Sequence, residues 1–246
     1  MYDAMLAESV TIAGHGGEAI EAYSARTLRD GPAGGVVVIH HLPGYDAATK
    51  EITRTFAVNG FNAVMPNLYH REAPGAAPDD AAATARARGG VPDERLVGDV
   101  AGGAAYLRGL SNSTGKVGVI GFCSGGRQSV LAACSLPLQA AVDCYGAFVT
   151  KDAPASGSFR PASLMPIIKD LSCPLLGLFG ADDGYPSPED VAVLAAELDA
   201  QGKTYDFHSY EGAGHAFFNV ARESYRPEAA ADGWQRIFGW FRQYLS

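Results

Sequence analysis

Residues 117–126 have the sequence Val-Gly-Val-Ile-Gly-Phe-Cys-Ser-Gly-Gly, an apolar run that ends in a glycine-rich turn around Cys123. The run is typical of a buried strand, and residues 127–134 after the turn are typical of a helix start. Gly121 and Gly125 flank the cysteine at two residues' distance, where glycine permits a tight turn and close backbone packing. Such a turn presents the Cys123 sulfur above a sheet and directs the first helix amides to the same place. The pattern therefore predicts a nucleophile where a strand turns into a helix.

Apolar and β-branched runs recur along the chain, separated by segments with helical spacing. The run 36–39 has no polar alternation, which is typical of a strand covered on both faces. We expect strands at 36–39, 61–66, 117–120, 140–146, 174–179 and 204–210, the last one at a sheet edge. We expect helices at about 48–59, 93–110, 162–170, 187–201 and 227–245. Residues 10–13 and 19–23 alternate at period two around a turn that contains His15, so they predict an N-terminal hairpin.

This order of elements predicts an α/β fold with a mostly parallel central sheet and helices on both faces. With 246 residues and 47% hydrophobic content, the chain is long enough and apolar enough for one such domain, residues 1–246. Residues 73–92 are rich in Ala, Gly, Pro and Asp. They predict an inserted excursion that is mobile or only partly helical.

The composition also excludes several classes of protein. A net charge of −8 argues against a nucleic-acid binder, which usually has a basic face. No apolar run approaches the ~18 residues of a membrane span, and residues 1–8 do not resemble a secretory signal. No CxxC pair occurs, so we expect free thiols in a reducing compartment, the cytoplasm. Cys134, Cys144 and Cys173 lie in apolar segments and are expected to be buried as small hydrophobic side chains.

The acidic partner of the nucleophile should follow a later strand, because functional groups collect at the carboxyl ends of parallel strands. Asp182 and Asp183 both follow the strand expected at 174–179. Asp183 is the better candidate, since Gly180, Asp183 and Pro186 match a G-x-x-D-x-x-P spacing. Asp182 is the alternative, or a residue that caps the turn.

The general base should lie near the end of the chain. His215 follows the last expected strand, and the small residues before it allow its loop to approach the nucleophile. His208 lies inside that strand and is a weaker candidate. The order Cys123, Asp183, His215 is the nucleophile–acid–base order of α/β-hydrolases, in which the strand–turn–helix motif is the nucleophile elbow.

In such a site Asp183 holds His215 in one tautomer, and His215 takes the proton of Cys123 and later delivers it to the leaving oxygen. The imidazolium and the helix N-terminus both favour the thiolate. Two backbone amides are expected to form the oxyanion hole, those of Ser124 and Leu42.

Five segments resemble the dienelactone hydrolase (carboxymethylenebutenolidase) family, and together they extend over nearly the whole chain. They are 38–44, 66–71, 121–126, 180–183 and 212–217. The resemblance implies an α/β-hydrolase that opens a dienelactone or a related small ester or lactone through a Cys–His–Asp triad, without a cofactor or metal. It further implies a monomer or weak homodimer whose partner is a small-molecule substrate.

Two positions depart from the family pattern. His41 stands where well-studied members have a glutamate that engages the resting cysteine, so His41 is expected to face the substrate instead. Asn219 stands where members that act on the dienelactone carboxylate have an arginine, and Asn offers no charge for that group. Arg71 is our candidate for the missing substrate contact, and Arg86 and Arg88 are further candidates. These departures predict the family chemistry with an altered or broader substrate.

Other functions are compatible with parts of this pattern. A general carboxylesterase or thioesterase of the same fold is the nearest alternative. A non-hydrolytic binding or redox-sensing protein would not need a His–Asp pair. A metal site built from His40, His41, His70 and Asp183 is disfavoured, because adjacent histidines in a strand point to opposite faces.

Overall fold

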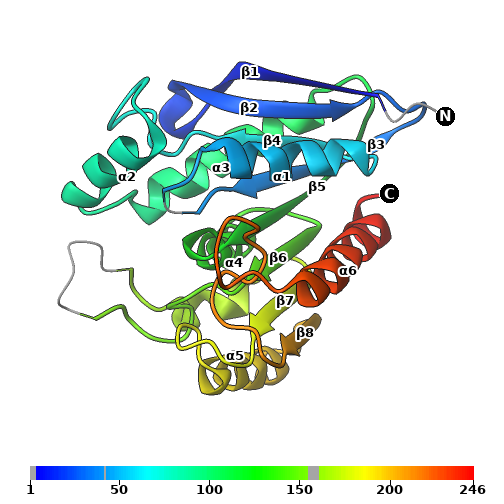
Figure 1. Ribbon diagram of the computed structural model, residues 1–246. Coiled ribbons are helices and arrows are strands. Elements are labelled where there is room, and N and C mark those ends of the chain that lie inside the picture. Colours follow the sequence, from blue (N-terminus) through cyan, green and yellow to red (C-terminus); the bar gives the residue numbers. More distant parts are fainter. Residues whose placement is uncertain (1–3, 42, 155–160) are drawn as a thin grey trace.

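The runs of valine and isoleucine form the middle of one eight-stranded sheet in a computed structural model that describes residues 4–41, 43–154 and 161–246 (Figure 1). The strands are β1 (Met5–Ala13), β2 (Ala19–Thr27), β3 (Ala33–Ile39), β4 (Asn62–Pro66), β5 (Ser113–Phe122), β6 (Ala140–Cys144), β7 (Leu175–Gly180) and β8 (Tyr205–Tyr210). The α-helices are α1 (Ala47–Val58), α2 (Pro78–Ala87), α3 (Asp93–Arg108), α4 (Ser124–Ser135), α5 (Pro188–Ala200) and α6 (Pro227–Leu245). Two short 3-10 helices are η1 (His15–Gly17) and η2 (Met165–Asp170).

The strand order is β1-β2-β4-β3-β5-β6-β7-β8. The hairpin β1–β2 is antiparallel and joins the sheet antiparallel to β4, whereas every pair from β4 to β8 is parallel. The predictions of an N-terminal hairpin and of a mostly parallel sheet are therefore confirmed. The carboxyl ends of β3, β5, β6, β7 and β8 meet at one edge of the sheet, where functional groups are expected.

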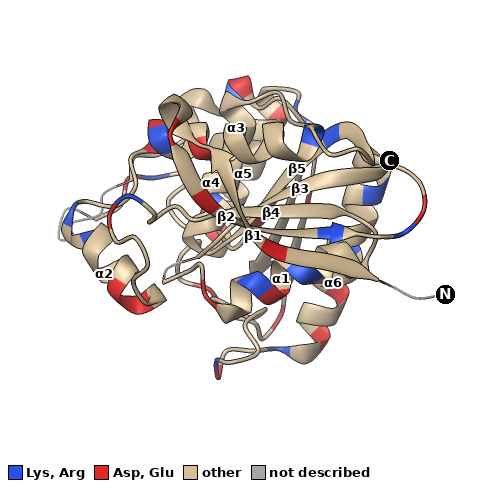
Figure 2. Ribbon diagram, turned by 90° about the horizontal axis from the view of Figure 1, so that it is seen from above, with Lys and Arg blue, Asp and Glu red and all other residues tan. Residues whose placement is uncertain are grey.

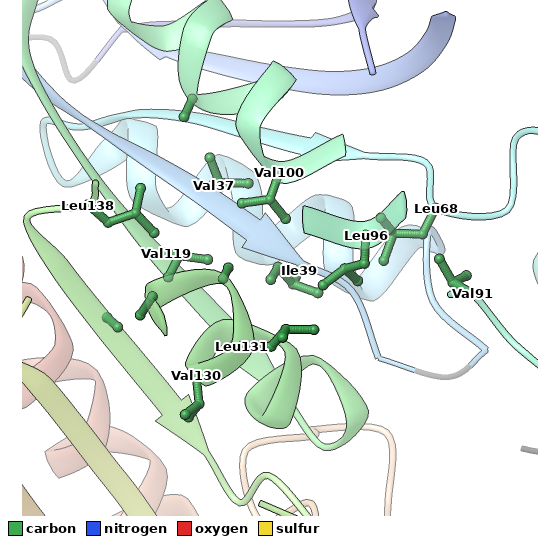
Figure 3. Close-up of a cluster of buried hydrophobic side chains, with 14 of the residues drawn as sticks. Val37, Ile39, Leu68, Val91, Leu96, Val100, Val119, Val130, Leu131 and Leu138 are labelled. Atoms are coloured by element: carbon green, nitrogen blue, oxygen red, sulfur yellow. The ribbon is translucent and has the colours of Figure 1, made fainter. Parts of the chain in front are cut away.

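Alternate residues of the central strands face two different cores. Val37 and Ile39 of β3 pack with α3, as their labelled neighbours Leu96 and Val100 show in Figure 3. Val36 and Val38 face the other side, where α1 and α6 cover the sheet with Phe56 and other aromatic side chains. Figure 2 shows α3 and the pair α1 and α6 on opposite sides of the strands. Helices therefore cover both faces, as the uninterrupted apolar run of β3 indicates.

Two segments differ in detail from the sequence prediction, and a third agrees with it. The hairpin strand β1 begins at Met5, five residues earlier than the alternating pattern indicated, and pairs with β2 along its whole length. The helix after the elbow begins directly after Cys123. The Ala-rich excursion 73–92 contains α2, so the expectation of partial helix is confirmed there; α2 lies at one end of the molecule (Figures 1 and 2).

Basic and acidic residues are interspersed along the ribbon, without a segregated face of one charge sign in this view (Figure 2). No helix in the described part of the chain is long and apolar enough to cross a membrane.

Gly102 provides a test of how the hairpin packs on α3. A Cβ at Gly102 would lie 1.9 Å from the Ala13 carbonyl oxygen, whereas a Cβ at Gly239 in α6 would meet nothing within 4 Å. Gly102→Ala is expected to lower the free energy of unfolding by about 1–3 kcal/mol, the usual cost of overpacking. Gly239→Ala should raise it by about 0.5–1 kcal/mol, because alanine favours the helix. Urea denaturation measures both, and equal effects of the two substitutions would contradict the close packing of α3 on β1.

Candidate active site

Cys123 lies at the sharp turn between β5 and α4. Its backbone has φ 56° and ψ −120°, a conformation that side-chain-bearing residues rarely adopt. Its N–H donates to the carbonyl of Cys144 at the end of β6 at 3.0 Å, and its own carbonyl accepts from the N–H of Gly126 at 2.9 Å. The Cys123 side chain is partly exposed at the carboxyl end of the sheet. The turn thus holds a sulfur above the sheet at the first turn of a helix.

The glycines of the motif are required by close backbone contacts. A Cβ at Gly121 would lie 1.9 Å from the carbonyl oxygen of Gly125, and a Cβ at Gly125 would lie 2.5 Å from that of Ile39. Side chains at either position would push α4 away from the ends of β3 and β5. Gly121 pairs with Ile39 in the parallel register of these strands, so the elbow also abuts the loop that follows β3.

The structure brings together Asp183 and His215, the residues predicted as acid and base. His215 Nδ1 lies 2.8 Å from Asp183 Oδ2. The Asp183 side chain is buried, and its other oxygen accepts from the Tyr185 N–H at 2.8 Å. The alternative, Asp182, donates its backbone N–H to the Ala213 carbonyl at 2.9 Å, and the histidine Nδ1 is engaged by Asp183 instead. Because the nitrogen on the Asp183 side donates, Nε2 of His215 is the nitrogen available to the nucleophile.

The charge state of His215 follows from its neighbours. Burial disfavours the imidazolium and lowers the pKa of His215, but hydrogen bonds to Asp183 and to Cys123 raise it, and the net result is about 10. The ring also packs edge-to-face on Tyr145, with the ring centroids 5.1 Å apart. The His215 ring is therefore protonated at neutral pH, where it lies between the Asp183 carboxylate and Cys123.

One of the two amides expected to form an oxyanion hole, that of Ser124, lies at the start of α4. Ser124 is the first residue of α4 and directly follows Cys123, so its N–H is among those at the helix start that have no intrahelical partner. Leu42 lies outside the described residues.

A cleft opens beside the elbow. Ser124 and Gln128 of α4, Tyr69 of the loop after β4, and Arg86 of α2 are among its lining residues. Burial raises the pKa of Tyr69, the positive charge of Arg86 lowers it, and the charge of Cys123 raises it further. Cys123 and the Arg86 cation therefore both lie within electrostatic range of Tyr69.

Arg71 does not line this cleft. Its guanidinium forms two hydrogen bonds to Asp99, at 2.8 and 3.0 Å, and a third to Glu18. The hydrogen bonds to the fully buried Asp99 raise the pKa of Arg71 further, against the effect of its own burial. These bonds tie the hairpin turn to α3, because Asp99 also accepts from the His15 N–H at 2.8 Å. The sequence expectation of a substrate contact at Arg71 finds no support in this arrangement.

His40 and His41 have different environments. His40 is buried, its Nε2 accepts from the Leu68 N–H at 3.2 Å, and its Nδ1 lies 3.0 Å from the His41 carbonyl. Burial lowers the pKa of His40 to about 4, so this ring is neutral and structural. The His41 ring lies 3.5 Å from Asp46, the residue that caps α1. Burial lowers the pKa of His41, although Asp46 opposes this effect.

The residues considered for a metal site are engaged elsewhere. His40 is held by Leu68, Asp183 by His215, and His70 Nδ1 accepts from the Glu21 N–H at 3.5 Å. Among the described residues, no group of three or more His, Cys, Asp or Glu side chains has a geometry that would hold a metal ion.

Two aromatic residues near the elbow were not singled out from the sequence. Tyr69 lines the cleft and Tyr145 packs on His215. Tyr69 lies three residues after the strand expected at 61–66, and Tyr145 lies near the end of the strand expected at 140–146. A position near the carboxyl end of an expected strand is the signal that would have found them. Asn219, in contrast, uses its side chain to accept the Ala221 N–H at 3.0 Å and so stabilises its own turn.

The family model that matches this chain is that of the dienelactone hydrolase family, over residues 20–245. A proposed carboxymethylenebutenolidase of Methylorubrum extorquens is 35% identical over 234 residues, which cover 92% of this chain and 77% of that protein. A proposed carboxymethylenebutenolidase of Escherichia coli is 34% identical over 248 residues, which cover 98% of this chain and 89% of that protein.

The solved structures include a close match. The crystal structure of a proposed dienelactone hydrolase of Klebsiella pneumoniae superposes with a TM-score of 0.85 at 32% identity, covering 98% of this chain and 100% of that chain. The fold is thus the α/β-hydrolase fold expected from the sequence. The chain belongs to the dienelactone hydrolase family and is a hydrolase of lactone or ester bonds.

Proposed function

We propose that the protein opens a small lactone or ester, of the kind named for its relatives, with Cys123 as nucleophile, His215 as general base and Asp183 as orienting acid. The observations that carry this proposal are the hydrogen bond between Asp183 and His215, at 2.8 Å, and the interaction of His215 with the elbow cysteine that raises the pKa of the histidine. These three groups come from the ends of three different strands. A purely structural cysteine would need neither the strained turn nor the paired histidine.

The reaction follows from this arrangement. The Cys123 thiolate attacks the carbonyl carbon, and the carbonyl oxygen becomes an oxyanion near the Ser124 N–H at the start of α4. The C–O bond then breaks, and His215 gives its proton to the leaving oxygen. This leaves a thioester on Cys123. A water molecule, deprotonated by His215, attacks the thioester and releases the acid and the free thiolate. We propose the backbone amide of Leu42 as the second oxyanion donor.

Arg86 is the residue to which we assign the recognition of an anionic substrate group. It lines the same cleft as Ser124, and it forms no ion pair with a carboxylate of the described residues. Arg71 is instead bound to Asp99 and Glu18. An Arg guanidinium binds a carboxylate through two parallel N–H donors. A carboxylated lactone or ester is therefore the proposed substrate class, and a neutral ester is the alternative.

The proposal also includes the cellular compartment, the domain organisation and the oligomeric state. The cysteines in the described chain, Cys123, Cys134, Cys144 and Cys173, are all free, which is consistent with a reducing compartment such as the cytoplasm. A single domain over residues 1–246 is supported by one sheet that receives strands from Met5 to Tyr210. A monomer or weak homodimer remains a prediction.

The nucleophile is tested by Cys123→Ala. Hydrolysis of p-nitrophenyl acetate is expected to fall by a factor on the order of 10³ or more, because all covalent chemistry passes through the sulfur. Cys134→Ala makes the same change away from the site and should retain activity. Thermal melting of both variants checks that they are folded. Turnover that survives in a folded Cys123→Ala variant would exclude this cysteine as the nucleophile.

The pair of His215 and Asp183 predicts a pH dependence of stability. The pKa of His215 in the folded protein, about 10, lies above the ordinary value of 6.5, so the pair stabilises the fold fully below about pH 6.5. This contribution is lost as the pH rises toward 10. The melting temperature of the wild type should exceed that of Asp183→Asn most at pH 6, and the difference should shrink by pH 10. Asp182→Asn is the control and should show no such trend; a constant difference for Asp183→Asn would contradict the charged pair.

The anion contact is tested by a panel of carboxylated and neutral esters and lactones. Arg86→Gln should raise KM for the carboxylated substrates by roughly 10-fold or more, the usual loss of a charge-assisted hydrogen bond, and leave neutral substrates unchanged. Arg88→Gln removes a neighbouring charge that does not line the cleft and should have no such effect. Arg71→Gln should lower stability without changing selectivity. Equal losses on both substrate types in Arg86→Gln would remove Arg86 from substrate recognition.

A further inference from the structure

Asp143 is a fully buried carboxyl group that the proposed reaction does not use. It lies on β6 between apolar residues, and its Oδ1 accepts from the Gly146 N–H at 2.7 Å. Its Oδ2 has no hydrogen-bond partner among the described residues. Burial raises the pKa of Asp143 to about 7, although the bond from Gly146 opposes this rise. Because a buried polar group without full pairing is costly, its presence here calls for a specific reason.

The turn that Asp143 closes lies directly under the first turn of α4. A Cβ at Gly126 would lie 2.3 Å from Asp143 Oδ1 and 2.8 Å from the Gly146 nitrogen, so helix and turn are in close contact. Within the turn, the Cys144 carbonyl accepts the Cys123 N–H at 3.0 Å. The end of β6 is thus one of the supports that hold the elbow.

The same turn also supports the base. Tyr145 has φ 47°, a positive value that is unfavourable for an aromatic residue, and its side chain is almost fully buried. This backbone conformation brings the ring against His215, at 5.1 Å between centroids and an interplanar angle of 65°. A strained conformation persists only where surrounding contacts fix it, and the Asp143–Gly146 hydrogen bond spans this residue.

We propose that Asp143 is a positioning residue for the nucleophile and the base. By closing the turn 143–146 it fixes the Cys144 carbonyl that holds the backbone of Cys123. By the same bond it fixes the Tyr145 ring against His215. The inference rests on the proposed function, because it assigns Asp143 a role in the geometry of that site.

The role requires one acceptor oxygen and no negative charge. Asp143 lines a small cavity of about 10 Å³ together with Thr150 and Asp190, close to the space that one water molecule needs. The neighbouring carboxylate of Asp190 is paired with the Lys151 cation at 2.7 Å. Asparagine keeps an acceptor where Oδ1 stands and has nearly the same shape. Asparagine at position 143 should therefore preserve the turn, whereas alanine, which has no acceptor, should not.

The test compares Asp143→Ala with Asp143→Asn in the hydrolysis of p-nitrophenyl acetate. Asp143→Ala is expected to lower kcat by roughly 10-fold or more while KM changes by less than about threefold, because misplacement of reacting groups affects the chemical step more than binding. Asp143→Asn should keep kcat within about threefold of the wild type. Asp99→Ala removes another fully buried carboxylate that accepts a backbone N–H, outside the site, and should lower the melting temperature without the loss in kcat.

Three outcomes would overturn the inference. They are an unchanged kcat in folded Asp143→Ala, an equal loss in Asp143→Asn, and a loss of the same size in folded Asp99→Ala. Should Asp143→Ala fail to fold, Tyr145→Leu provides the second measurement. It removes the ring from His215, and an unchanged kcat would again overturn the proposal. Cys123→Ala in the same assay distinguishes failure of this inference from failure of the proposed function, because turnover retained in Cys123→Ala would contradict the proposed function itself.

Discussion

The close approach of three backbone segments at the elbow is the constraint on which the site depends. Gly121 and Gly125 lack a Cβ because each faces a carbonyl oxygen that a side chain would strike. Only then can α4 begin directly after β5, and only then does Cys123 take its positive φ with its N–H on Cys144. The position of the sulfur is thus determined by strands β3, β5 and β6 together. Rigid elements of this kind hold a reacting atom more precisely than a free loop does.

The parallel sheet accounts for the meeting of groups that lie far apart in the sequence. Asp183 and His215 follow β7 and β8, which pair in parallel on the same side of β6. Their loops therefore leave the sheet at the same edge as the elbow. Burial of Asp183 then gives its hydrogen bond to His215 its strength, because a carboxylate removed from water interacts strongly with a nearby cation. The charge of His215 is a consequence of this position.

The sequence predicted those features that local patterns and chain order determine. The run 36–39 indicated a strand buried on both faces, and β3 is such a strand. The choice of Asp183 over Asp182 came from spacing, and Asp183 is the residue that bonds to His215. Arg71 was less predictable, because its partner Asp99 lies 28 residues away on another element and nothing in the local pattern distinguishes a bound arginine from a free one. The full burial of Asp143 also depends on the packing of α4 over β6, which no local pattern encodes.

Strained backbone is concentrated at the edge that carries the site. In the described part of the chain, the non-glycine residues with positive φ are Tyr45, Cys123, Tyr145, Phe148 and Ala216. Cys123 and Tyr145 directly follow the neighbouring strands β5 and β6, and Ala216 directly follows His215. Each such residue costs on the order of 1–3 kcal/mol, so the surrounding contacts must stabilise it. The bonds that do so are specific: Cys123 is held through Cys144, and the turn containing Tyr145 is closed by Asp143. Because these two bonds belong to one turn, the positions of Cys123 and of the Tyr145 ring that packs on His215 are not independent, and a change in the turn should affect both.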